Sequence, residues 1–338
     1  MLNFFNLVLL VSDILERIVN KIINLDVNEI ENFDFPLDEV FGIETLVDGI
    51  KYEFIAKFSS SSDGLICFGS GAADKVGPNA IEPPIFHRFS WHKSFDESVL
   101  FYNDPTRYLG DLKVGWCIGD RNIWYLEVIT DIIGFISENL SINSKHILFY
   151  GSSAGGFNSI QLGTLIRGSL VLINNSQLIL PNYVNHIFEK VLKTCFGDMN
   201  RENIFNNYGY RLNVLELFEK MKYIPPIIYH VNMLSKMDIT RQCIPFIEGL
   251  KNLNFSNEIE MVEINFHASH SGNNNHNPLN KETTIKLIKF ALKNKVYYNK
   301  EYHLENIERR TEHGFRNHIF YKYIKKFMYI MIKIFKNK

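Results

Sequence analysis

The sequence predicts an α/β protein built on a doubly wound, mostly parallel sheet. Six short apolar runs alternate along the chain with segments of helical spacing; the runs cover residues 65–68, 99–102, 146–150, 170–173, 227–231 and 259–266. Runs of this length without polar alternation are typical of strands buried on both faces, and the helices between them supply the crossovers that parallel strands require. Ligands of such sheets bind beyond the carboxyl ends of the strands, so we expect the functional side chains there.

The segments of helical spacing account for much of the remaining chain; they cover residues 123–139, 157–166, 183–222, 241–253 and 281–294. Residues 2–24 also carry apolar side chains at helical spacing, and residues 41–58 are expected to form two short strands. These patterns predict a helical N-terminal extension (1–40), an α/β domain (41–298) with a helical insertion at about 183–222, and a C-terminal tail (299–338).

The composition is that of a globular protein and argues against several classes of function. Of the 338 residues, 46% are hydrophobic and 22% are charged, which separates the chain from disordered sequences. A formal net charge of −1 provides no overall basic character, so no nucleic-acid partner is expected. No uncharged apolar run reaches the roughly 18 residues of a membrane-spanning helix, and residues 1–11 lack the basic start and cleavage site of a signal peptide.

The cysteines indicate a reducing compartment. They are widely separated and form no CxxC pair; they are Cys67, Cys117, Cys195 and Cys243. This spacing argues against a disulfide framework and against a zinc site built on cysteine. We therefore expect core thiols, a cytoplasmic location, and neither a metal nor a resident cofactor.

The segment Gly151-Ser152-Ser153-Ala154-Gly155 fits the pattern G-x-S-x-G and makes Ser153 the candidate nucleophile. An apolar strand leads into it and a helical segment follows, which is the strand–turn–helix context that this motif needs. The turn is sharp, so Gly151 and Gly155 are expected to provide the space around it. The alternative is a Gly/Ser-rich turn that binds phosphate, although no Lys follows as a Walker-type loop would require.

The longer segment from Tyr150 to Gly156 resembles the nucleophile elbow of the α/β-hydrolase superfamily. Together with Asn174-Asn175-Ser176-Gln177 after the next strand, it resembles a branch found among bacterial capsule and surface-polysaccharide biosynthesis proteins. The likeness covers roughly residues 60–295. It implies a serine esterase or O-acyltransferase acting on a carbohydrate, with acyl-CoA as a conceivable acyl donor for a transferase. The other reading is a non-catalytic accessory protein of a polysaccharide assembly complex.

In α/β-hydrolases the acid and the histidine follow the serine in that order, each after a later strand. Asp238 follows the run 227–231 and is the candidate acid, unless it only caps the next helix; Glu248 and Asp198 are weaker rivals. The candidate base is His276, in the polar loop before the last helix, and the resemblance also points to it.

The loop that carries His276 also contains His270, the alternative base, and His267, the third choice. Three histidines so close together are also compatible with a metal site, but no carboxylate or cysteine cluster accompanies them. A solvated loop explains at least two of the three.

The oxyanion hole is expected to consist of backbone N–H groups from Ala154 and from Ser70 or Gly71, unless the latter form only a tight turn. Downstream of this turn lies a polar-aromatic loop that fits a sugar, an anionic group or simple packing; it contains His87, Arg88, Trp91 and His92.

The tail carries a stripe of lysines on a predicted helix. They fall within an arc of roughly 100° on the helical wheel, opposite apolar residues; they are Lys322, Lys325, Lys326, Lys333 and Lys336. This pattern is typical of a helix lying on an anionic membrane surface, here the inner face of the membrane. It is equally typical of a helix packed on the domain or on a partner chain with its lysines in water.

Overall fold

The structure is a computed structural model that describes residue 15 and residues 18–74, 81–255, 262–270 and 273–294. The lysine stripe of the tail and most of the predicted helix at 2–24 lie outside these residues.

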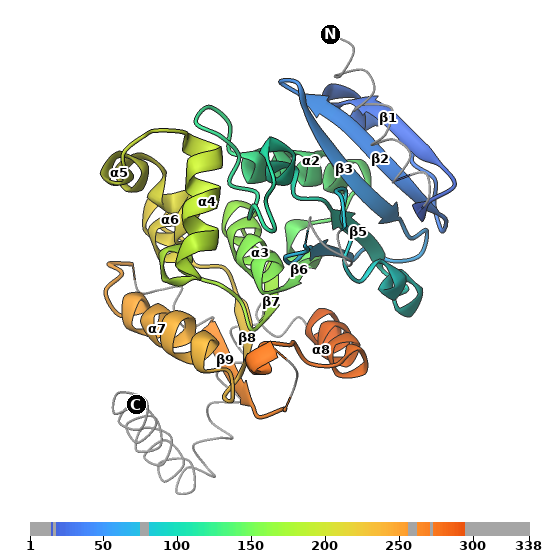
Figure 1. Cartoon of the computed structure of the whole chain (residues 1–338). Coiled ribbons are helices and arrows are strands. Elements are labelled where there is room, and N and C mark those ends of the chain that lie inside the picture. Colours follow the sequence, from blue (N-terminus) through green and yellow to red (C-terminus); the bar gives the residue numbers. More distant parts are fainter. Residues whose placement is uncertain (1–14, 16–17, 75–80, 256–261, 271–272, 295–338) are drawn as a thin grey trace, which may run out of the picture. The chain divides into compact units, whose positions relative to one another are not determined.

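The described part of the chain contains a nine-stranded sheet with the order β1-β2-β3-β5-β4-β6-β7-β8-β9 (Figure 1). The strands are β1 (Ile22–Asp26), β2 (Val40–Val47), β3 (Ile50–Lys57), β4 (Leu65–Gly69), β5 (Ser98–Tyr102), β6 (Ile147–Ser152), β7 (Leu170–Asn174), β8 (Ile227–Asn232) and β9 (Val262–His267). Strands β4 to β9 pair with their neighbours in parallel, whereas β3 is antiparallel to both β2 and β5. The six predicted parallel strands and the two predicted strands at 41–58 are therefore confirmed.

The N-terminal expectation is wrong for residues 22–24, which belong to strand β1 and not to a helix. Ile23 is buried, whereas Ile22 is only partly buried and Asn24 is exposed, and Ile23 pairs with Ile43 of β2. A short apolar run reads equally well as helix or strand. Here the open edge of β2 provides backbone partners and decides the outcome.

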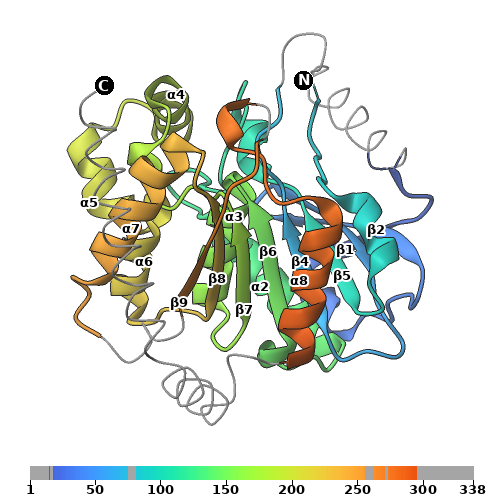
Figure 2. The ribbon, with the colours of Figure 1, turned by 90° about the horizontal axis from the view of Figure 1, so that it is seen from below.

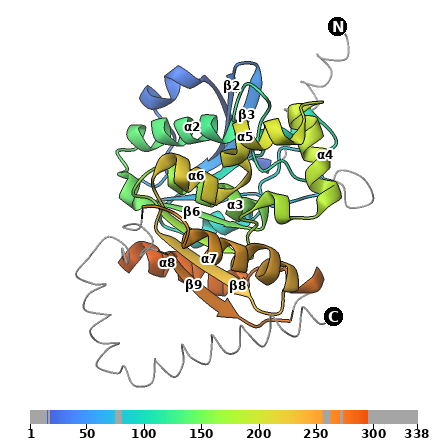
Figure 3. The same cartoon turned by 90° about the vertical axis from the view of Figure 1, so that its left-hand side faces the viewer.

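Helices cover both faces of the sheet, as the predicted fold requires. They are α2 (Tyr125–Asn139), α3 (Ala154–Leu165), α4 (Asn185–Phe196), α5 (Arg201–Leu212), α6 (Val214–Met221), α7 (Ile244–Leu250) and α8 (Lys281–Asn294). Figure 2 shows α8 in front of the sheet with α2 and α3 behind it, and Figure 3 shows the face with α2, α3, α6 and α7. The predicted helices at 123–139, 157–166, 183–222 and 281–294 are thus confirmed, and 241–253 is helical over most of its length.

All four cysteines are free and buried, as expected of core thiols. No helix among the described residues is both long enough and apolar enough to cross a membrane.

A buried carboxylate on β3 anchors the loop between β4 and β5. The Glu53 side chain accepts hydrogen bonds from Tyr108 Oη at 2.5 Å and from Asn103 Nδ2 at 3.0 Å. Asn103 Oδ1 in turn accepts from the backbone N–H of Ile85 in that loop. Burial raises the pKa of Glu53 to about 7, although Lys51 and the Tyr108 hydroxyl act in the opposite direction.

This raised pKa predicts that the protein loses stability as the pH rises. The folded state holds the Glu53 proton more tightly than the unfolded state, so the contribution to stability is present below pH 4.5 and lost as the pH rises through 7. Relative to Glu53→Gln, which stays neutral, the wild type should lose up to about 3 kcal/mol of unfolding free energy across this window. Urea unfolding of both proteins between about pH 5 and pH 8 measures the difference.

The exposed Glu202→Gln provides the matched control and should parallel the wild type. Parallel stability curves for wild type and Glu53→Gln would show instead that Glu53 is ionised throughout this range.

Candidate active site

Ser153 lies at the sharp turn between β6 and α3, with φ of 53° and ψ of −125°. A non-glycine residue in this conformation is strained, and strained serines at such turns project their hydroxyl away from the backbone. The flanking glycines are required by contact: a Cβ on Gly151 would lie 2.2 Å from the Gly155 carbonyl, and one on Gly155 would lie 2.4 Å from the Gly69 oxygen. The predicted strand–turn–helix context is therefore present.

The structure brings together the three side chains that the sequence singles out as nucleophile, base and acid. Ser153 Oγ lies 3.0 Å from His276 Nε2. His276 Nδ1 lies 2.7 Å from Asp238 Oδ2 and 3.0 Å from Oδ1. The serine hydroxyl can thus donate to His276, and the Nδ1–H of the same ring donates to the carboxylate.

Asp238 is only 1% exposed and lies at the start of a π-helical turn, Asp238–Cys243. It does not cap a helix, because the residue at the cap position is Met237. Ser235 Oγ donates to Asp238 Oδ2 at 2.5 Å, so the carboxylate is held by both Ser235 and His276. The weaker rivals Asp198 and Glu248 are exposed, and the carboxylate bound to His276 is that of Asp238.

The other histidines of the loop point elsewhere. His267 ends β9, with Nδ1 3.2 Å from Ser269 Oγ, and burial lowers its pKa. His270 is exposed. Neither histidine reaches Ser153 or Asp238 in the described structure, so His276 is the residue with the geometry of a base.

The segment after β7 connects the serine turn to the histidine loop, a role that the sequence analysis did not assign. Asn175 is fully buried, and its Nδ2 donates to the carbonyls of His276 at 3.0 Å and Asn277 at 2.8 Å. The backbone N–H of Ser153 lies 3.2 Å from the carbonyls of both Asn174 and Asn175. One short segment thus positions both the candidate nucleophile and the candidate base.

Gln177, from the same segment, contacts the candidate nucleophile directly. Its Nε2 donates to Ser153 Oγ at 2.9 Å, and the Trp116 indole N–H faces its Oε1 at 3.4 Å. Because an indole N–H is only a donor, this contact places the amide oxygen toward Trp116 and the amide nitrogen toward Ser153. Gln177 is 2% exposed, so the bond is shielded from water.

This contact predicts that Gln177 stabilises negative charge as it develops on Ser153 Oγ. Gln177→Ala should lower kcat for a small ester by about ten- to a hundredfold with a smaller change in KM, because the donor acts on the reacting oxygen. Gln177→Glu should lower kcat further, since a carboxylate would oppose the developing charge. Steady-state kinetics on both variants, with thermal melting as a check of folding, measures the effect.

The matched control is Gln161→Ala, a buried glutamine that donates to the Tyr210 carbonyl away from Ser153. Unchanged kcat in Gln177→Ala would limit Gln177 to a packing role.

The predicted oxyanion donors have different surroundings. Ala154 is the first residue of α3, so its N–H has no acceptor within the helix. The N–H of Gly71 donates to His87 Nδ1 at 3.0 Å and is therefore engaged in this structure. The Ser70 hydroxyl donates to the Ile85 carbonyl at 2.6 Å, which fixes the turn.

His87 is uncharged at neutral pH. Burial lowers its pKa to about 4, and the positive charges of Arg88 and Arg107 add to the effect. A neutral ring whose Nδ1 accepts the Gly71 N–H must carry its proton on Nε2.

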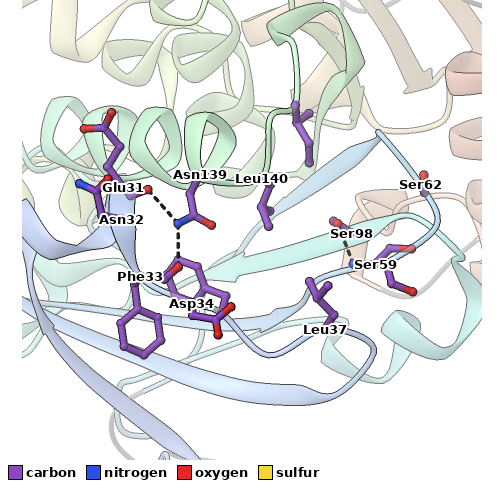
Figure 4. A pocket seen from close by; sticks show the side chains of 13 residues that line it. Glu31, Asn32, Phe33, Asp34, Leu37, Ser59, Ser62, Ser98, Asn139 and Leu140 are labelled. Carbon is purple, nitrogen blue, oxygen red and sulfur yellow. Dashed lines mark hydrogen bonds between the residues drawn. The ribbon is translucent and has the colours of Figure 1, made fainter.

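A cavity of about 520 Å³ lies at the opposite end of the strands (Figure 4). Its lining includes Ser62, just before β4, and Ser98, the first residue of β5, whereas the serine turn follows the carboxyl end of β6. Asn139 on its wall donates to the carbonyls of Ile30, Glu31 and Phe33, which is a structural role.

Within the described ranges, no group of three or more His, Cys, Asp or Glu side chains is arranged to hold a metal ion.

The sequence matches no protein-family model and no curated protein. Solved structures do match. The capsule O-acetyltransferase of Neisseria meningitidis serogroup A superposes with a TM-score of 0.55 at 15% identity, over 74% of this chain and 96% of that chain. An S-formylglutathione hydrolase from Agrobacterium tumefaciens has a TM-score of 0.51 at 11% identity, over 75% and 94%. The glycosylation associate protein complex (Gap123) from Streptococcus agalactiae has a TM-score of 0.51 at 16% identity, over 75% and 46%. At these identities the similarity establishes a shared fold.

Proposed function

The chain has the α/β-hydrolase fold, and from this premise we propose that it is a serine acyl-ester enzyme, an esterase or an O-acyltransferase. The observation that carries the proposal is the continuous set of contacts from Ser153 Oγ through His276 to the buried Asp238. A hydroxyl, an imidazole and a carboxylate at these distances form a nucleophile, its general base and the group that orients the base.

The proposed reaction has two halves. Ser153 Oγ attacks the acyl carbonyl carbon while His276 Nε2 takes the hydroxyl proton, and Asp238 stabilises the resulting imidazolium. The Ala154 N–H donates to the oxyanion of the tetrahedral intermediate. When the ester C–O bond breaks, the leaving oxygen takes the proton from His276 and the acyl group remains on Ser153.

In the second half a hydroxyl compound attacks the acyl-serine while His276 takes its proton. Collapse of this intermediate returns the proton to Ser153 and releases the acylated product. Water as the attacking group gives an esterase, and a sugar hydroxyl gives an O-acyltransferase. For a transferase the acyl donor is a co-substrate of the acyl-thioester or acyl-ester class.

We assign a carbohydrate as the substrate class. The support is the fold shared with the meningococcal capsule O-acetyltransferase, together with the resemblance of residues 150–156 and 174–177 to polysaccharide-biosynthesis proteins. The test of this assignment is product analysis after incubation with acetylated and non-acetylated glycans, with and without an acyl donor.

The alternative is a non-catalytic accessory protein of a polysaccharide assembly complex; the chain also shares its fold with a chain of the glycosylation associate protein complex (Gap123). Labelling with a fluorophosphonate probe separates the two functions. The proposal expects covalent labelling of the wild type at Ser153, no labelling of Ser153→Ala, and strongly reduced labelling of His276→Ala. A wild-type chain that is folded but unreactive would support the accessory function.

A further inference from the structure

Arg88 occupies an unusual backbone position beside the serine turn. It precedes the short helical turn Phe89–Ser94 and has φ of 65° and ψ of 13°, in the left-handed region. A side chain with a Cβ costs about 1 kcal/mol or more there, a conformation that glycine adopts more readily. The surrounding contacts therefore have to hold a large cationic side chain in place.

Those contacts aim the guanidinium at the end of β6. Arg88 Nη2 donates to Ser152 Oγ at 2.5 Å, and Ser152 directly precedes the nucleophile. The guanidinium carbon lies 5.4 Å from the centre of the Tyr150 ring and 5.5 Å from that of Trp91. Side chains two residues apart in a strand point to the same side, so Tyr150 and Ser152 lie on one face of β6. Arg88 contacts both of them and thus lies along that face, next to the serine turn.

Arg88 has no acidic counter-ion among the described residues. Two buried arginines are satisfied differently: Arg107 donates to the carbonyls of Ala73 and Leu112, and Arg211 donates to that of Asp120. In the part of the chain that the structure describes, Arg88 uses one N–H, on Ser152, and leaves the rest of its donors open. The neighbouring His87 adds no negative charge, and Asp238 is already paired with His276.

A fixed guanidinium with open donors is a binding group for oxyanions. Its planar N–H groups match the oxygens of phosphate or carboxylate in a bidentate geometry. The Tyr150 and Trp91 rings contact the guanidinium without accepting its N–H groups in conventional hydrogen bonds, so these donors remain available to a ligand. Partial burial strengthens such a bond because water screens the charges less. Arg88 is half-buried, so its edge remains accessible.

We propose that Arg88 binds a phosphate or carboxylate group of the substrate next to the scissile acyl group, so that the site prefers anionic acyl esters over neutral ones. This inference rests on the proposed function and adds to it a substrate class. The anionic group belongs either to the acyl side or to the alcohol side of the ester, and the two sources are distinguished by the pairs of substrates below.

The test compares matched esters on the full-length protein. On the acyl side, the mono-4-nitrophenyl ester of succinate is paired with 4-nitrophenyl butyrate; on the alcohol side, 3-acetoxybenzoate is paired with its methyl ester. For at least one pair, the wild-type kcat/KM should favour the anionic member by about tenfold or more, and Arg88→Gln should lower this ratio by about ten- to a hundredfold. Arg88→Lys should restore part of the ratio, because it keeps the charge but not the planar fork.

Arg167→Gln is the matched control, because Arg167 also stacks on a tyrosine, Tyr223, but lies beyond the far end of α3. It should leave the ratio unchanged. The same ratio in wild type and Arg88→Gln for both pairs would overturn the Arg88 assignment while leaving the esterase function in place.

A readout without turnover separates the two proposals. Calorimetric titration with inorganic phosphate should show binding to Ser153→Ala and none to the double variant Ser153→Ala, Arg88→Gln. A wild type inactive toward all four esters and toward the fluorophosphonate would overturn the proposed function, and phosphate binding would still decide whether Arg88 holds an oxyanion. Equal phosphate binding by both variants would overturn the Arg88 site.

Discussion

Replacing Ser153 with alanine is expected to lower kcat for a small neutral ester by about 10⁴- to 10⁶-fold. The reason is chemical: no other hydroxyl lies at the turn with a 3.0 Å contact to an imidazole that is itself paired with a buried carboxylate. The residual rate would come from the remaining hydrogen-bond donors of the site. Steady-state hydrolysis of 4-nitrophenyl acetate by the purified variant measures the loss.

The control for Ser153→Ala is the adjacent Ser152→Ala. Ser152 is 5% exposed and its hydroxyl accepts from Arg88, so its loss removes one hydrogen bond but no reacting atom. We expect about a tenfold decrease or less for a neutral ester. Both variants should keep the thermal transition of the wild type within a few degrees, since each removes a single oxygen atom. Comparable turnover in Ser153→Ala and wild type would exclude Ser153 as the nucleophile.

The parallel strands and the serine turn could be predicted because each depends on local sequence. A short apolar run bounded by turn residues specifies a buried strand, and Gly151 and Gly155 specify a turn in which only a missing Cβ fits. The candidate acid and base followed from chain order, because side chains after parallel strands meet at one edge of the sheet. Their places after β8 and β9 led to Asp238 and to a loop with three histidines, and the position before the last helix together with the family resemblance selected His276.

The contacts that could not be predicted are those made by side chains from unrelated parts of the chain. The Gln177 amide contacts Ser153 on one side and Trp116, from a distant loop, on the other. The engagement of the Gly71 N–H by His87 depends on the path of the long loop between β4 and β5, which sequence periodicity does not encode. Strand β1 was missed for a similar reason, since its short apolar run acquires strand structure from pairing with β2.

Replacing His276 with alanine is expected to cost about as much activity as replacing Ser153, on the order of 10⁴- to 10⁶-fold in kcat. Without the ring, the Ser153 hydroxyl has no base within hydrogen-bonding distance among the described residues. The double variant Ser153→Ala, His276→Ala should be no slower than either single variant, because the three groups act as a unit. Kinetics of the two single variants and the double variant on one ester measure this non-additivity.

The neighbouring histidines provide controls for the His276 prediction within the same loop. His270→Ala should keep most of the activity, because His270 is exposed and the imidazole that contacts Ser153 Oγ is that of His276. His276→Ala should also lower stability by about 1 to 3 kcal/mol, since it leaves the Asp238 carboxylate, 1% exposed, with Ser235 as its remaining partner. Removing that carboxylate as well, in His276→Ala, Asp238→Asn, should recover stability without recovering activity. An inactive His270→Ala beside an active His276→Ala would transfer the base to His270 and contradict the observed geometry.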